Sequence, residues 1–103
     1  MATTGVEASA GDLLVRGGTL IDGTGAPGRP ADVRVRAGRI SEVGRGLVEH
    51  GESVIDARGA VVAPGFIENH AHVDPALFWD PFCDPSPQHG VTTMLAGNCS
   101  LSL

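Results

Sequence analysis

The stretch that divides this sequence reads Ala60-Val61-Val62-Ala63-Pro64-Gly65-Phe66-Ile67. An apolar run is interrupted by a Pro-Gly pair and then resumes, and regular structure does not continue easily through such a pair. The break indicates a boundary between two structural units. We therefore expect one unit over residues 12–63 and a second over residues 64–103, preceded by a flexible tail of small and polar residues over 1–11.

Short β-strands separated by glycine are predicted for residues 12–63. In Asp32-Val33-Arg34-Val35-Arg36 the valines alternate with arginines, which is the period of a strand with one buried side and one side in water. Ala37-Gly38 suits a hairpin turn, so residues 39–43 are expected to form the returning strand. Further strands are predicted at 13–16, 19–21 and 53–56. This unit is expected to hold three or more antiparallel strands around a small core.

The second part of the chain has a different pattern. Residues 91–96 form a continuous β-branched and apolar run between Gly90 and Gly97, which predicts a parallel strand covered on both faces. Another strand is expected over residues 66–73. The segment between them, residues 74–89, holds four prolines and has room for one short helix at most. The whole chain is therefore predicted to be mainly β.

Composition narrows the functional classes. Hydrophobic residues make up 42% of the 103 residues and charged residues 18%, which is typical of a globular protein. Seven Lys and Arg against twelve Asp and Glu give a net charge of −5, so a nucleic-acid partner is not expected. No apolar run suits a signal peptide or a membrane span, and two cysteines are too few for a disulfide framework. We expect a cytoplasmic protein without a membrane partner.

His70 and His72 are the first candidates for chemistry. On a strand they would project from the same face, and one metal ion could contact both imidazoles. The spacing alone permits a metal site without establishing one, because two polar residues at the end of a strand give the same pattern. The surrounding sequence has to decide between these interpretations.

Several ordered motifs resemble the amidohydrolase superfamily. Pro64-Gly65-Phe66-Ile67-Glu68-Asn69-His70-Ala71-His72 resembles the start of its barrel, where the signature is Pro-Gly-Phe-Ile-Asp followed by His-x-His. Residues 12–25 are similar to the opening strands of the family. The motifs that resemble the N-acyl-D-amino-acid deacylase branch are Trp79-Asp80-Pro81, Pro85-Ser86-Pro87, His89-Gly90-Val91-Thr92-Thr93 and Gly97-Asn98-Cys99. The resemblance covers about nine-tenths of the chain, from Asp12 onward.

The resemblance implies a fold and a metal site. It implies a small β-sandwich-like unit followed by the first two strands of an incomplete (β/α)8 TIM-type barrel. It also implies that His70, His72 and Cys99 bind a divalent metal ion, with zinc as the first choice, and that no other catalytic residue lies in this segment. The implied reaction is metal-dependent hydrolysis of the amide bond in an N-acylated amino acid or a related small amide.

Some residues allow more than one interpretation. Cys99 can also be a small buried apolar residue, the usual role of a lone cysteine. Asp74 is either a hydrogen-bond acceptor for a ligand imidazole or an exposed loop acid. Cys83 is interpreted as an ordinary loop thiol, and His89 as a residue that shapes the entry of the following strand. Glu68, Val73-Asp74 and Ser100 stand where the family often has other residues.

The predicted barrel is incomplete. A barrel of this class takes roughly 250 residues, and residues 64–103 have room for two strands. We expect an N-terminal fragment that is inactive alone and that can self-associate through exposed strand edges. One alternative is a non-enzymatic β-rich module that binds a metal or a partner. Another is a cyclic amidase of the hydantoinase or dihydroorotase kind, which Cys99 disfavours.

Overall fold

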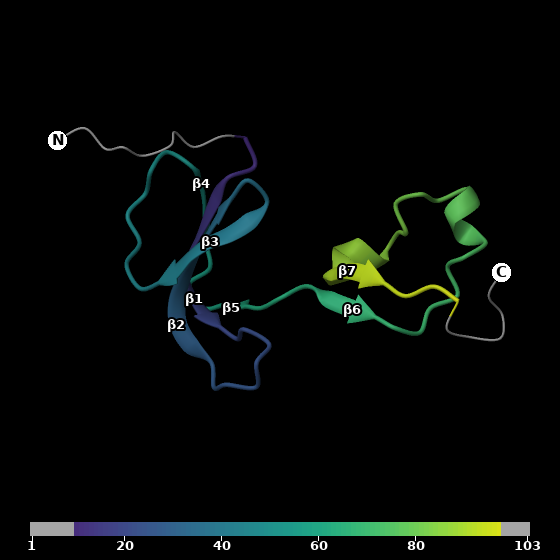
Figure 1. Cartoon of the computed structure of the whole chain (residues 1–103), viewed down its shortest axis with the longest axis horizontal. Helices are drawn as coiled ribbons and strands as arrows, with labels where there is room; N and C mark the ends of the chain where they lie inside the picture. Colours follow the sequence, from purple (N-terminus) through teal and green to yellow (C-terminus); the bar gives the residue numbers. More distant parts are fainter. Residues whose placement is uncertain (1–9, 98–103) are drawn as a thin grey trace. The chain divides into compact units, whose positions relative to one another are not determined.

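The computed structural model describes residues 10–97 and divides into two compact units, one ending at Pro64 and the other beginning at Gly65 (Figure 1). The prediction of a mainly β chain is confirmed. Residues 1–9 of the expected tail lie outside the described range, and so does Cys99. The elements are, in chain order, β1 (Leu13–Leu20), β2 (Arg29–Arg36), β3 (Arg39–Gly44), β4 (Ser53–Asp56), β5 (Val61–Val62), β6 (Phe66–Glu68), the 3₁₀ turns η1 (Ala76–Phe78) and η2 (Ser86–His89), and β7 (Val91–Met94). In residues 10–97 no helix is long and apolar enough to span a bilayer.

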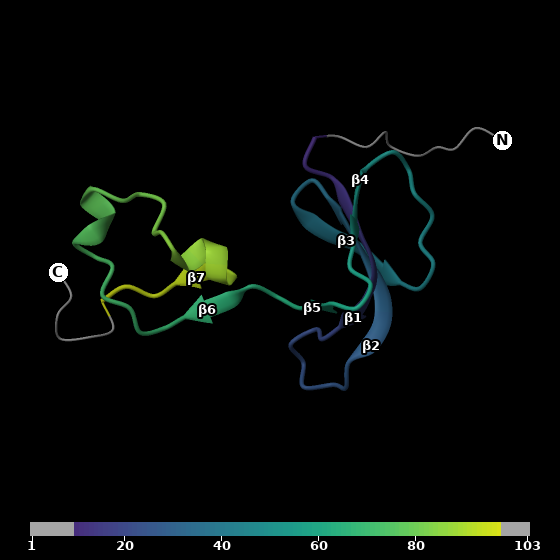
Figure 2. The ribbon, with the colours of Figure 1, turned by 180° about the vertical axis from the view of Figure 1, so that it is seen from behind.

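A five-stranded sheet forms the first unit. Its order is β3-β2-β1-β4, and β5 also pairs with β1 (Figure 2). The pairs β1–β2 and β2–β3 are antiparallel, as expected. β4 and β5 instead run parallel to β1. The alternation of apolar and polar residues does not indicate the direction of β4. That direction depends on residues 45–52, which carry the chain from β3 at one edge of the sheet to β4 at the other edge.

The hairpin between β2 and β3 has the backbone that its sequence predicts. Ala37 and Gly38 both have positive φ, 49° and 73°, which is what a two-residue type I′ turn requires. The buried carboxylate of Asp12 accepts a hydrogen bond of 3.0 Å from the backbone amide of Ala37. The turn is therefore tied to the start of β1.

A bulge at Gly17-Gly18 allows β1 to pair with two short strands, β4 and β5, along one of its edges. The register of β1 against β2 shifts between Val15 and Gly18, and Gly17 has a φ of 78°. A Cβ atom on Gly18 would lie 2.5 Å from Cγ2 of Val62, so β5 can approach only a glycine. The first half of β1 therefore pairs with β4 and the second half with β5.

The core of this sheet is small. Leu20, Ala31 and Val33 form its buried cluster, with Val15 and Val62 packed against it, and Leu14 is the one fully buried large side chain among the described residues. Because so little apolar surface is buried, the stability of this unit also depends on hydrogen bonds and ion pairs.

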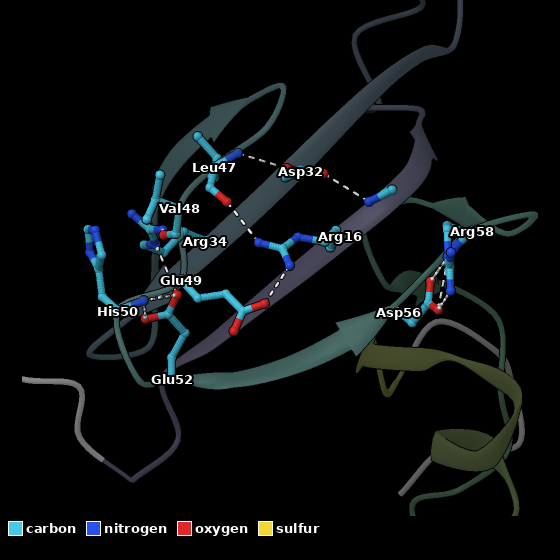
Figure 3. Close-up of polar contacts among 11 residues, drawn as sticks. Arg16, Asp32, Arg34, Leu47, Val48, Glu49, His50, Glu52, Asp56 and Arg58 are labelled. Atoms are coloured by element: carbon cyan, nitrogen blue, oxygen red, sulfur yellow. Dashed lines mark hydrogen bonds and ion pairs between the residues drawn. The ribbon is translucent and has the colours of Figure 1, made fainter.

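Arg34 is buried, with 4% of its surface exposed, although the alternation in β2 predicted that its arginines face water. The cause is the segment 45–52, which covers this face of the sheet. The guanidinium donates a hydrogen bond to the carbonyl oxygen of Val48 and forms an ion pair with Glu52 (Figure 3). It also forms an ion pair with Glu42. The side chain of Glu52 is 1% exposed, so its pair with Arg34 is shielded from solvent.

Asp32 binds the segment 45–52 near its start. Its carboxylate accepts hydrogen bonds of 2.8 Å from the amide of Gly17 and 2.9 Å from the amide of Leu47 (Figure 3). Arg16 donates to the carbonyl oxygen of Leu47 at 2.9 Å and pairs with Glu49. The segment 45–52 is thus fastened to both β1 and β2 by polar contacts.

Replacing Arg34 with methionine should destabilise the first unit strongly, because it leaves the carboxylate of Glu52 buried without its cation. The matched control is Arg58→Met, which removes an ion pair to Asp56 whose side chains are 80% and 55% exposed. Urea unfolding followed by circular dichroism should show a large loss of unfolding free energy for Arg34→Met and little change for Arg58→Met. Equal losses in the two variants would contradict this assignment.

Stability should also fall in acid because of Asp32. The hydrogen bond from Gly17, against the opposing effect of burial, holds the pKa of Asp32 below its ordinary 3.8. A lowered pKa stabilises the folded state above the ordinary value, and this contribution is lost as the pH falls through the folded-state value. The pKa of Asp22 is also lowered, to about 2, mainly through a hydrogen bond from Thr24, and adds to the same trend.

The measurement is the unfolding free energy of the wild type and of Asp32→Asn as the pH falls from about 5 to about 2. We expect the wild type to lose stability below pH 3.8 and the variant to show a shallower decline, with the remainder carried by other carboxylates whose pKa is lowered, such as Asp22 and Glu52. Identical slopes would show that Asp32 makes no such contribution.

Candidate metal site

The second unit is built on two parallel strands. Phe66 pairs with Val91 and Glu68 with Met94, so β6 and β7 run in the same direction, as the sequence predicted. Backbone hydrogen bonds extend the pairing at both ends, from Phe66 N to Gly90 O at 2.8 Å and from Leu95 N to Glu68 O at 2.9 Å. The crossover contains two short 3₁₀ turns instead of the single short helix that the four prolines left room for.

Gly65 permits the close approach of the two strands. A Cβ atom built on Gly65 would lie 2.2 Å from both Cγ2 and Oγ1 of Thr92. Such distances are far inside van der Waals contact, so every larger residue at position 65 would push the strands apart. The glycine of the Pro-Gly pair is therefore required by packing as well as by the chain break.

The side chains of this unit are largely uncovered. The sequence predicted a β7 covered on both faces, but Thr92 and Thr93 are exposed, and Val91 and Met94 are half-buried. All four aromatic residues of the chain, Phe66, Phe78, Trp79 and Phe82, lie here and are 66–83% exposed. Two short strands do not provide a second layer against which these groups can pack.

β6 ends at Glu68, earlier than the strand expected over residues 66–73, so His70 and His72 lie just beyond it in irregular backbone. The alternation of side chains along a strand therefore does not explain why the two histidines are adjacent. Their rings are nevertheless adjacent, with centroids 5.4 Å apart and an interplanar angle of 71°. Both residues are exposed, and the backbone amide of His70 donates a hydrogen bond of 2.9 Å to Oε1 of Glu68.

This arrangement fits the donor set of a metal site. With metal–nitrogen bonds of about 2.0–2.1 Å, two imidazoles on one tetrahedral ion have ring centroids roughly 5 Å apart. The observed 5.4 Å lies close to that separation. Within residues 10–97 no group of three or more His, Cys, Asp or Glu side chains gathers in a way that could hold a metal ion. The third predicted ligand, Cys99, stays a prediction because it lies outside the described residues.

The remaining candidates are placed as follows. Cys83 is a half-buried free thiol with a φ of 55°, in a hollow of about 240 Å³ that β7 helps to line. His89 is the last residue of η2, and Gly90 ends that turn with a φ of 87° immediately before β7. Asp74 is half-buried, two residues beyond His72. Glu68, which departs from the family signature, accepts a hydrogen bond from the backbone amide of His70.

Known proteins resemble both units. Residues 53–102 match the amidohydrolase family. The N-acyl-D-aspartate deacylase of Alcaligenes xylosoxydans xylosoxydans is 47% identical over 92 residues, which is 89% of this chain and 18% of that protein. The structure of an N-acyl-D-glutamate deacylase from Bordetella bronchiseptica, complexed with zinc and a phosphonate inhibitor, matches with a TM-score of 0.81 and 43% identity over 88% of this chain and 19% of the other.

A crystal structure of D-aminoacylase matches with a TM-score of 0.78 and 48% identity, over 85% of this chain and 19% of that one. A D-hydantoinase structure matches less well, with a TM-score of 0.55 and 35% identity over 61% of this chain. The chain is similar to amidohydrolases over residues 53–102 and to deacylases over most of its length. Among the amidohydrolases it matches the N-acyl-D-amino-acid deacylase branch, and it spans about a fifth of the length of the relatives in that branch.

Substituting Gly65 with alanine should disrupt the pairing of β6 and β7, because the new methyl group overlaps Thr92. Amide hydrogen exchange at Phe66 and Leu95, whose hydrogen bonds close the two ends of the pairing, measures the effect directly. The control is Gly44→Ala, whose added Cβ would meet only Cδ2 of Leu47, at 3.6 Å. Unchanged protection in Gly65→Ala would mean that the close approach is not needed.

Proposed function

We propose that this chain is the N-terminal part of a metal-dependent amidohydrolase that removes the acyl group from N-acyl-D-amino acids. The main observation behind this proposal is the pair of adjacent imidazoles just after β6, with ring centroids 5.4 Å apart. Its support is the 47% identity to N-acyl-D-aspartate deacylase over most of this chain. The substrate class is a small N-acylated amino acid, hydrolysed at a carbon–nitrogen bond.

His70 and His72 would hold the metal with Cys99, and zinc is the first choice because a related deacylase structure contains it. The bound metal would lower the pKa of a water molecule and polarise the amide carbonyl. The protein's own contribution is to present two imidazole nitrogens from one short segment, which reduces the entropy lost when the ion is bound.

We further propose that β6 and β7 are the first two strands of a (β/α)8 barrel. Active sites of such barrels lie at the carboxyl ends of the strands. His70 and His72 follow the carboxyl end of β6, and Cys99 comes after the carboxyl end of β7 in the sequence. The pairing is parallel, as this fold requires. A soluble cytoplasmic enzyme without a nucleic-acid partner is consistent with the acidic composition.

Two strands do not enclose an active site, so the 103-residue chain by itself should show no turnover. Its uncovered aromatic side chains and strand edges should favour self-association. The cyclic-amidase alternative is disfavoured because the D-hydantoinase structure matches less of the chain, with a lower TM-score than the deacylases.

A chimera tests the proposed function. The segment of the Alcaligenes N-acyl-D-aspartate deacylase that matches this chain is replaced with the corresponding residues of this chain. We expect the chimera to hydrolyse N-acyl-D-aspartate in the presence of zinc. His70→Ala and His72→Ala should each lower kcat/KM by at least about a hundredfold, because each removes a metal ligand.

The control in the chimera is His50→Ala, since His50 lies in the first unit against Arg36 and should leave kcat/KM unchanged. Full activity of both His70→Ala and His72→Ala would remove the pair from the metal site. Zinc-dependent hydrolysis by the isolated 103-residue chain would contradict the requirement for further barrel strands.

A further inference from the structure

The end of β6 poses a structural question about His70. The strand stops at Glu68, yet the two histidines that follow it have adjacent rings. Both are exposed, so burial in a core does not fix them. A contact other than the strand ladder must restrict the backbone between Glu68 and His70.

Glu68 makes two hydrogen bonds that serve this purpose. Its carbonyl oxygen accepts from Leu95 N at 2.9 Å, which closes the pairing of β6 with β7. Its side-chain Oε1 accepts from His70 N, also at 2.9 Å. One residue therefore ends the ladder and begins the turn that follows. The hydrogen bond to His70 N is exposed to solvent, whereas the bond from Leu95 N extends the pairing of the two strands.

A side-chain oxygen that accepts from the amide two residues later forms a closed turn, as aspartate and asparagine commonly do. Such a turn restricts the backbone dihedral angles of the two residues that it encloses. A charged acceptor makes this hydrogen bond stronger than a neutral one. The first histidine is thereby held at a fixed position relative to the end of β6.

We propose that Glu68 is a positioning residue for the histidine pair: its carboxylate holds His70 beside His72 through the His70 backbone amide. The proposal rests on the proposed function only in giving the pair its role as metal ligands. Glu68 acts here as a hydrogen-bond acceptor, and in residues 10–97 it does not join the two histidines in a group of three ligand side chains.

Two substitutions separate hydrogen bonding from charge. Glu68→Gln keeps an acceptor oxygen and removes the charge, whereas Glu68→Met keeps the length and removes the acceptor. The matched control is Asp80, whose Oδ1 accepts from Phe82 N at 3.2 Å in the same two-residue arrangement. Asp80→Leu removes that turn from the same unit without touching the histidines.

The first readout needs no metal. In the full 103-residue chain, nuclear magnetic resonance measures amide exchange at His70 and the Overhauser contact between the His70 and His72 rings. We expect Glu68→Met to exchange at least about tenfold faster at His70 and to lose the ring contact. Glu68→Gln should keep both, and Asp80→Leu should leave both unchanged.

The second readout is zinc affinity by titration calorimetry. Glu68→Met should weaken zinc binding by about tenfold or more, and Glu68→Gln should bind nearly as the wild type does. The proposal is overturned if Glu68→Met keeps the ring contact and the amide protection, or if Glu68→Gln loses them as fully as Glu68→Met. A wild-type chain that binds no zinc would count against the proposed function, while the resonance data would still decide the role of Glu68.

Discussion

The carboxylate of Asp32 lies between two backbone amides from different parts of the first unit, and the arrangement of the sheet depends on this bridge. The amide of Gly17 comes from the bulge in β1, and the amide of Leu47 comes from the segment that crosses the sheet. The bridge sets where that segment crosses. β4 can then lie parallel to the first half of β1, which leaves the second half to β5 and to the chain that leads into Pro64.

The fold could be predicted from the sequence where a structural feature depends only on residues that are neighbours in the chain. Alternation in β2 predicted a strand, and Ala37-Gly38 predicted a tight turn, because both depend on neighbouring residues alone. The direction of β4 and the burial of Arg34 could not be predicted in this way. Both follow from residues 45–52, which have no periodicity and are held by polar contacts between residues distant in the sequence.

The candidate site, like the fold, could be predicted from the sequence only in part. His70 and His72 could be singled out from their spacing and from the motif around them, and the structure does bring their rings together. The reason proposed for that closeness was wrong, because β6 ends before the first histidine. The contact from Glu68 could not be anticipated, since a side chain that hydrogen-bonds to backbone at the end of a strand leaves no periodic signal. The role of Cys99 stays a prediction.

The placement of the aromatic residues has a practical consequence. The chain contains one tryptophan, Trp79, and no tyrosine, and its three phenylalanines are also in the second unit. Intrinsic fluorescence therefore reports on the second unit alone, whereas most of the strand signal in far-ultraviolet circular dichroism comes from the first. The two optical signals provide separate probes of the two units without any added label, so their melting curves can show whether the units unfold together.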